Sequence, residues 1–169
     1  MTPHTAPSTE RRVTVGLGDR AYDIVIKRGA LAEVGERLTS VGLSGKAAVV
    51  TNPVVGRLYG ATVLRSLKGA GFRTVLVTLP DGERHKTLRS VARVLDALAA
   101  ARFERGSTVL ALGGGVIGDL AGFAASVYQR GIQFVQLPTT LVAQVDSSVG
   151  GKTGVNHVLG KNLIGAFYQ

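Results

Sequence analysis

Cysteine and tryptophan are both absent from this chain of 169 residues. Without cysteine the chain can form neither a disulfide framework nor a thiolate metal site, so a reducing compartment, the cytoplasm, is the expected location. Long apolar runs are missing as well. The roughly 18 consecutive apolar residues of a membrane span occur nowhere, so no membrane association is expected. Residues 1–12 lack the apolar core of a signal peptide and are expected to be a disordered lead-in.

Aromatic residues make up only 5% of the chain, which bears on how its charge is interpreted. The formal net charge is +9, and clustered Lys and Arg bind nucleic acid by releasing counterions from the phosphates. Here the basic residues are scattered, and the aromatic platforms on which bases stack are missing. Nucleic-acid binding is therefore not expected, and a small anionic ligand accounts for the charge better.

Hydrophobic residues and glycine are what the chain has in quantity. The hydrophobic fraction of 45% is sufficient for the core of one globular domain. The 23 glycines follow no fixed period, which excludes a collagen-like chain, where glycine recurs at every third position. We interpret them as turns and as places where backbones approach closely.

The apolar spacing predicts an α/β domain over residues 13–169. Residues 13–17 and 22–27 alternate apolar with polar around Gly18 and Asp19, the pattern of an antiparallel hairpin. A helical spacing follows over residues 30–41. Beyond it, strands are expected at 47–51, 74–79, 108–112 and 134–137, and helices within 54–70, at 88–101 and at 116–128. This alternation predicts a Rossmann-like, mostly parallel sheet with helices on both faces.

Residues 139–165 break the alternation. They are rich in Gly, Ser, Thr and Asn, with only short apolar pieces. This composition predicts a binding loop over a sheet edge in place of regular structure.

A glycine turn follows the strand expected at 108–112. Gly113, Gly115 and Gly118 fit the spacing G-x-G-x-x-G between a strand and a helix, where backbone amides can approach a pyrophosphate at the helix N-terminus. The alternative is a turn without a ligand. An ordinary Rossmann unit has an acidic residue about 20 positions further on, and none lies between Asp119 and Asp146. If a dinucleotide binds, the sheet is connected differently.

A second motif resembles a phosphate-binding loop of nucleotide triphosphatases. Gly151, Lys152 and Thr153 match its last three residues, but Asp146 stands where the loop opens with glycine, and a carboxylate there would repel phosphates. A triphosphatase is therefore not expected. Asp146 and Lys152 still lie in a polar, glycine-rich segment suited to catalysis, and their alternative role is an ion pair that closes the loop.

Six short motifs in order resemble those of the 3-dehydroquinate synthases, a family within the sugar-phosphate cyclases. The resemblance extends from about residue 13 to the end of the chain. The motifs are Pro80-Asp81-Gly82-Glu83 with Lys86, Gly113 to Asp119, Arg130-Gly131, Pro138 to Leu141, Gln144 to Gly154, and Leu159 to Asn162.

The resemblance implies an NAD-dependent carbon–oxygen lyase of the shikimate pathway, which leads to chorismate and the aromatic amino acids. Such an enzyme converts 3-deoxy-D-arabino-heptulosonate 7-phosphate, an anionic keto-acid phosphate, to 3-dehydroquinate and phosphate. The hydride cofactor is used because a transient ketone makes the neighbouring proton acidic. Alternatives are another sugar-phosphate cyclase, whose substrate would differ, and a non-catalytic NAD-binding module.

The resemblance also implies a set of NAD contacts. On the adenosine and ribose side they are Asn52, Asp81, Gly82, Glu83, Arg84, His85 and Lys86, with Glu83 as the missing ribose acid. Around the pyrophosphate and nicotinamide they are Gly114, Gly115, Val116, Ile117, Gly118, Asp119, Thr139, Thr140, Lys152 and Lys161. Asp119 could instead be a plain helix cap.

Substrate binding and catalysis are implied for Lys152, Asp146 and Asn162. Lys152 would act as a point charge for carboxylate or phosphate, and Asp146 would accept hydrogen bonds from hydroxyls. Arg130 resembles a residue that reaches the substrate phosphate from a partner subunit, which implies a homodimer. Its alternative role is a cation at a helix C-terminus.

No metal site is expected within these residues. His4, His85 and His157 show no metal-ligand spacing, and the one Glu and two His that bind zinc or cobalt in the family belong to a helical domain that follows. We therefore expect the chain to be the cofactor-binding part of the enzyme and, by itself, inactive.

Overall fold

The structure, a computed structural model, describes residues 9–169. Four parallel strands form the central sheet, in the order β4-β3-β5-β6. The strands are β3 (Lys46–Thr51), β4 (Arg73–Thr78), β5 (Thr108–Gly113) and β6 (Gln133–Pro138). Each lies within two residues of the range that the apolar spacing predicts.

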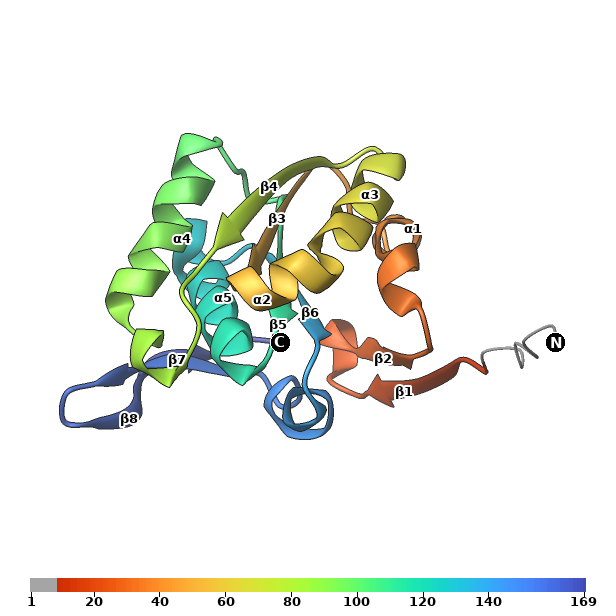
Figure 1. Ribbon diagram of the computed structural model, residues 1–169. Coiled ribbons are helices and arrows are strands. Elements are labelled where there is room, and N and C mark those ends of the chain that lie inside the picture. The colour runs from red at the N-terminus through yellow and green to blue at the C-terminus, as the bar shows by residue number, and fades with distance from the viewer. Residues whose placement is uncertain (1–8) are drawn as a thin grey trace, which may run out of the picture.

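Helices cover both faces of this sheet (Figure 1). One face carries α1 (Val34–Ser40) and α3 (Ala61–Gly69), and the other carries α4 (Leu88–Ala100) and α5 (Gly115–Val127). The chain reaches α3 through α2 (Pro53–Val55) and a π-helical turn. Short 3-10 or π-helical turns lie at Gly18–Arg20, Ala30–Glu33, Gly56–Gly60, Glu83–His85, Tyr128–Arg130 and Ala143–Ser147.

The central strands β3 and β5 are almost entirely buried because both faces of the sheet are covered. Along β3, Ala47 and Val49 pack with the side chains of α1 and α3, whereas Ala48 and Val50 pack with those of α4 and α5. Side chains alternate between the two faces of a strand, so each apolar layer takes every second residue. The predicted Rossmann-like arrangement is confirmed. No helix within residues 9–169 is long and apolar enough to cross a membrane.

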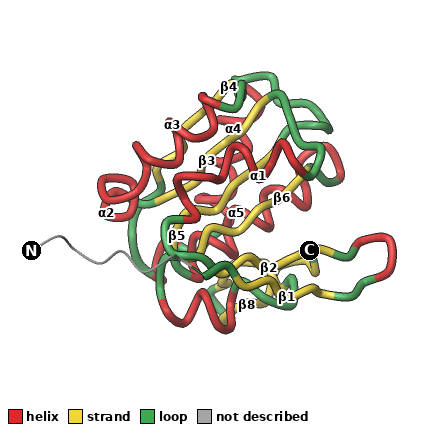
Figure 2. Tube along the Cα trace, turned by 90° about the vertical axis from the view of Figure 1, so that its right-hand side faces the viewer, coloured by secondary structure: helices red, strands yellow, loops and turns green. Residues whose placement is uncertain are grey.

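The chain's first described element is the predicted hairpin. β1 (Arg11–Val15) pairs antiparallel with β2 (Tyr22–Ile26), and Figures 1 and 2 show the hairpin beside the sheet rather than within it. β1 begins two residues before the expected domain start at residue 13. Of the expected lead-in, residues 1–8 lie outside the described range.

The prediction of a loop over residues 139–165 is wrong for its second half. β7 (Lys152–His157) pairs antiparallel with β8 (Gly160–Phe167), and the hairpin packs on α5. Gly154 lies opposite Gly165. A Cβ on Gly154 would come within 2.5 Å of the Ile164 carbonyl oxygen, and one on Gly165 would overlap the Thr153 carbonyl. These glycines let the two strands approach each other. The loop prediction is wrong here because the sequence pattern treats glycine as a sign of a loop.

The glycine turn lies at the point of the sheet where the order of successive strands reverses. β3 connects to β4 on one side, and the chain then returns to β5 on the other side of β3. In open α/β sheets, ligands bind at the carboxyl ends of the strands at such a switch point. Asn52 follows β3 there, and Gly113 ends β5, with Gly114 and Gly115 directly after it.

Candidate functional site

Gly114 and Gly115 let the start of α5 lie close against the segment that follows β6. A Cβ on Gly114 would lie 3.2 Å from the Thr140 Cγ2, and one on Gly115 would lie 2.9 Å from the Ser147 Oγ. Gly114 is the N-cap of α5, and no side chain caps this helix. The amides of the first turn, which includes Val116 and Ile117, therefore have no partner from a capping side chain and can receive an anion.

The third glycine of the motif has a different task. A Cβ on Gly118 would lie 2.8 Å from the Gln136 Oε1 on β6. Gly118 therefore permits close packing of α5 on the sheet, which is the usual role of the last glycine in a dinucleotide turn.

Two buried hydroxyl groups lie next to the glycine turn. Thr139 donates its amide to the Gly113 carbonyl at 3.0 Å. Its Oγ1 and the Oγ of Ser147 are buried and have no hydrogen-bond partner within residues 9–169. Thr140, by contrast, caps the next turn, because its Oγ1 accepts from the Ala143 amide at 3.2 Å. Buried polar atoms are rarely left unpaired, so the two free hydroxyls indicate a place where a polar ligand completes the structure.

The segment after β4 meets the end of β3 at the same edge of the sheet. Asn52 accepts a hydrogen bond from the Val55 amide, which caps α2, and donates through Nδ2 to the Asp81 Oδ1 at 2.8 Å. Gly82 has φ of +101°, a conformation that glycine adopts readily. The chain then turns through Glu83–His85, where the Arg84 Nε donates to the His85 Nε2 at 3.0 Å.

Lys86 links this turn to α5 and to β8. It is 5% exposed, and its ammonium group pairs with Asp119 and donates to the Asn162 Oδ1 at 2.5 Å. Asp119 lies within α5 and does not cap it. Burial raises the pKa of Asp119 above its ordinary value, and the bond from Lys86 opposes that rise. Three predicted site residues are therefore in direct contact.

The remaining predicted site residues do not join this group directly. Asp146 lies in an exposed π-helical turn, and Lys152 and Lys161 are exposed on β7 and β8. Asp146 and Lys152 form no ion pair with each other, so the alternative of a loop-closing pair is not supported. Lys152 begins a strand, whereas a triphosphatase loop continues into a helix.

Arg130 lies far from the glycine turn. It follows α5, whose 13 residues span about 20 Å, at the end opposite Gly115. Arg130 is exposed and has φ of +68°. Its position at the C-terminal end of α5 also fits the alternative role of a cation on the helix dipole.

Two residues that contact the predicted set received no role from the sequence. Ser147 was part of a motif, but only the folded chain shows its hydroxyl next to Gly115. Asn156 contacts both Glu83 and Asn162. A polar residue between Val155 and His157 gives no recognisable sequence signal, because its partners come from distant segments.

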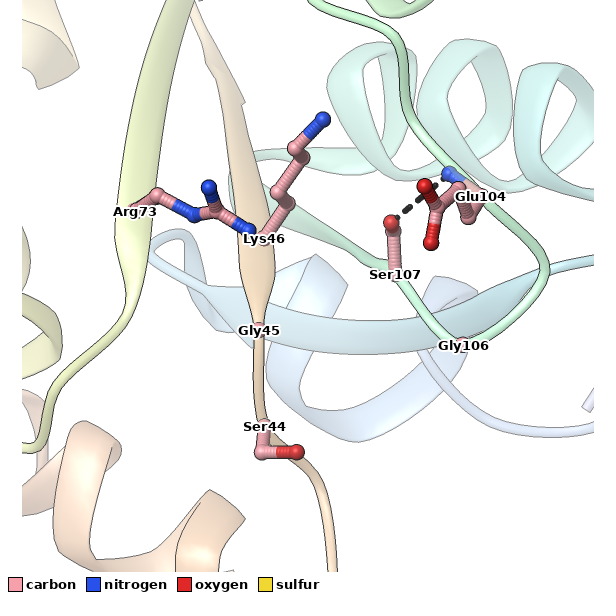
Figure 3. Close-up of a pocket in the computed structure, with 7 residues that line it drawn as sticks. All are labelled: Ser44, Gly45, Lys46, Arg73, Glu104, Gly106 and Ser107. Carbon is pink, nitrogen blue, oxygen red and sulfur yellow. Dashed lines mark hydrogen bonds between the residues drawn. The ribbon is translucent and has the colours of Figure 1, made fainter.

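The cavity in Figure 3 lies away from this site. Its volume is about 210 Å³, and its lining includes Lys46, Arg73 and Ser107, which lie at the amino ends of β3, β4 and β5. The glycine turn is at the opposite, carboxyl ends of the strands. Within residues 9–169, no group of three His, Cys, Asp or Glu could hold a metal ion.

Similar sequences agree on one family. Residues 76–169 match the family model described as 3-dehydroquinate synthase N-terminal. A 3-dehydroquinate synthase of Gloeobacter violaceus is 58% identical over 158 residues, which are 94% of this chain and 44% of that protein. The corresponding protein of Citrifermentans bemidjiense has the same identity and coverage. The chain thus spans less than half the length of the curated relatives it matches.

The similar solved structures include two cyclases. A crystal structure of 2-deoxy-scyllo-inosose synthase, complexed with carbaglucose-6-phosphate, NAD+ and Co2+, superposes with a TM-score of 0.83 at 25% identity, over 94% of this chain and 42% of that one. A 2-epi-5-epi-valiolone synthase from Streptomyces hygroscopicus, with NAD+ and Zn2+ bound, gives 0.78 at 34% identity, over 91% and 42%.

Proposed function

The chain belongs to the 3-dehydroquinate synthase family, and we propose that it provides the NAD-binding part of an enzyme that converts 3-deoxy-D-arabino-heptulosonate 7-phosphate to 3-dehydroquinate and phosphate. The observation that carries this proposal is the glycine turn at the switch point of the sheet, with two unpaired hydroxyls buried beside it.

The residues at this edge of the sheet fit NAD. The amides at the start of α5 and the hydroxyls of Thr139 and Ser147 suit a pyrophosphate, since all of them can donate. Glu83 suits the ribose hydroxyls, and Asn52 and Asp81 suit the adenosine, since they lie at the ends of β3 and β4. A side chain at Gly114 or Gly115 would meet Thr140 or Ser147 and would move these residues relative to the start of α5.

Held at the glycine turn, NAD would supply reversible hydride transfer to and from one substrate alcohol. The chain's own residues would bind and orient the substrate. Lys152 offers a cation to a carboxylate or phosphate, Asp146 accepts from hydroxyls, and Asn162 is held by its bond to Lys86. Lys161, next to Asn162, adds a second exposed cation for an anionic ligand.

The family's divalent metal does not fit the residues described here, which offer no group of three ligands. No step of the reaction is therefore assigned through a metal on these residues. We propose that zinc or cobalt is bound by a further part of the enzyme. The source reading frame beyond Gln169 tests this: a helical segment with one Glu and two well-separated His supports it, and a frame without them contradicts it.

Sequence identity favours this activity over that of the other cyclases. The 3-dehydroquinate synthases match at 58% identity, against 25% and 34% for the two structurally similar cyclases. Lys152, Asp146 and Asn162 favour an enzyme over a non-catalytic module, because a pure cofactor binder does not need them.

We further propose that the enzyme is a cytoplasmic homodimer. The lack of cysteine supports the location. The position of Arg130, exposed at the end of α5 that faces away from the glycine turn, supports a role in a partner's site. Sedimentation of the purified protein tests the dimer, and a monomer at all concentrations contradicts it.

Calorimetry with NAD tests the cofactor proposal. The wild-type chain should bind NAD with saturable heat, and Gly115→Val should bind at least tenfold more weakly, because its side chain meets Ser147. Gly69→Val is the matched control, since a Cβ there has nothing within 4 Å. A flat trace at millimolar NAD on folded wild-type protein would contradict the proposal.

A further inference from the structure

Asn156, on β7, forms three hydrogen bonds to two other segments of the chain. Its amide donates to the Lys86 carbonyl at 2.9 Å. Its side-chain Nδ2 donates to the Glu83 Oε1 at 2.8 Å, and its Oδ1 accepts from the Asn162 amide at 2.9 Å. One residue therefore joins the turn after β4 to both strands of the β7–β8 hairpin.

The local backbone of the hairpin brings Asn156 and Asn162 together. The β7–β8 register is irregular between Val155 and His157, so Asn156 has no residue opposite it in the ladder. Between the paired residues, β7 has only Asn156 whereas β8 has residues 161–163, so the bulge lies on β8 and redirects the residues around Asn162. Across the hairpin, Asn162 has φ of +56°, an uncommon conformation for a residue other than glycine. The bond from its amide to Asn156 holds that conformation.

The contacts close a ring. Asn156 holds the backbone of Asn162, the side chain of Asn162 accepts from the Lys86 ammonium, and the carbonyl of Lys86 accepts from the Asn156 amide. Within residues 9–169, Glu83 is attached to the ring through one carboxylate oxygen, Oε1. Its second oxygen, Oε2, remains available to a ligand.

We propose that Asn156 is a positioning residue that fixes the β7–β8 hairpin to the cofactor side of the site and orients the Glu83 carboxylate toward a ribose hydroxyl. The second half of this statement rests on the proposed function. It follows that Asn156 contributes to the choice between NAD and NADP, since an acid that accepts from the ribose 2′-hydroxyl disfavours a 2′-phosphate.

Two substitutions separate the two contacts. Asn156→Ala removes both side-chain bonds. Asn156→Asp keeps an oxygen that can accept from the Asn162 amide but places a carboxylate, which cannot donate, against Glu83. Circular dichroism of both variants, with wild-type protein as reference, checks that each is folded.

The first measurement needs no ligand. Hydrogen exchange at the Asn162 amide should be about three- to tenfold faster in Asn156→Ala, as expected for one lost hydrogen bond, and within twofold of wild type in Asn156→Asp. Unchanged exchange in Asn156→Ala would overturn the claim that Asn156 holds the hairpin.

The second measurement compares NAD and NADP by calorimetry. Both variants should lose about tenfold in NAD affinity and clearly less in NADP affinity, so the preference for NAD falls. A merely structural role would weaken both nucleotides equally, and that result overturns the orienting role. If folded wild-type protein binds neither nucleotide, the proposed function fails and the orienting role with it, while the exchange of the Asn162 amide still decides whether Asn156 holds the hairpin.

Discussion

The carboxylate of Asp119 on α5 is ion-paired with the ammonium group of Lys86, and the two side chains are only 19% and 6% exposed. The pair joins the turn after β4 to the helix that follows the glycine turn. Removing one partner of a buried pair leaves the other charge without compensation, which costs far more than the pair itself contributes.

Lys86→Met should therefore lower the free energy of unfolding by about 3 kcal/mol, the lower end of the range for a broken buried pair. Urea unfolding at neutral pH measures the loss. The double variant Lys86→Met with Asp119→Leu is the control and should recover much of it, because no charge is then left buried. A loss below about 1 kcal/mol in the single variant, typical of an exposed pair, would show that the pair is well solvated.

Asp119 should also make stability depend on pH. Burial raises its pKa above the ordinary value of 3.8 in the folded state, so the folded protein binds this proton more readily than the unfolded chain. The contribution of Asp119 to stability is therefore full below pH 3.8 and is lost as the pH rises through the folded-state pKa. The free energy of unfolding of wild type relative to Asp119→Asn should fall as the pH rises over this interval. If the difference in free energy of unfolding between wild type and Asp119→Asn grows with pH, the pKa of Asp119 is not raised by folding.

The contact between Gly154 and Gly165 leads to a prediction about the hairpin. Gly165→Ala places a Cβ against the Thr153 carbonyl, and a backbone atom cannot turn aside. We expect a loss of roughly 1–3 kcal/mol in the free energy of unfolding, the usual cost of overpacking. Gly106→Ala is the matched control, because a Cβ there has nothing within 4 Å. Equal stability of the two variants would show that the strands separate easily.

The central sheet could be predicted because the apolar residues of its strands and helices follow recognisable patterns along the chain. β3 and β5 are almost wholly apolar runs, and α3 and α4 have helical apolar spacing, so neighbouring residues alone indicate these elements. The glycine turn was located for the same reason, since a strand precedes it and a helix follows.

The β7–β8 hairpin and the bonds of Asn156 could not be predicted. Gly154 and Gly165 reduce the apolar alternation of their strands, and their purpose is visible only when the partner strand is present. The pairing of Lys86 with Asp119 has the same character. The residues next to Lys86 and Asp119 in the sequence do not indicate that the two side chains pair. The sequence suggests a helix cap for Asp119 as the alternative to a cofactor contact.

Ion pairs attach the β1–β2 hairpin to α1. No residue of either strand is buried, so apolar packing contributes little. Arg37 on α1 bonds Glu10 at 2.7 Å and Glu33 at 2.6 Å, and Glu33 also pairs with Lys27. The bonds from Arg37 and Arg12 lower the pKa of Glu10 to about 2. The contribution of Glu10 to this attachment is therefore complete above pH 4.5, the ordinary pKa of a glutamate. It is lost as the pH falls toward about 2.

We expect Arg37→Gln to release the hairpin without unfolding the sheet. Hydrogen exchange should become faster at the β1–β2 amides and remain unchanged at the β3 amides. In wild-type protein, about 1 M salt should act in the same direction, because it screens exposed charges. Arg65→Gln, on the exposed side of α3, is the control for losing one arginine. If the β1–β2 amides exchange equally slowly in Arg37→Gln and in the control, contacts other than these ion pairs hold the hairpin.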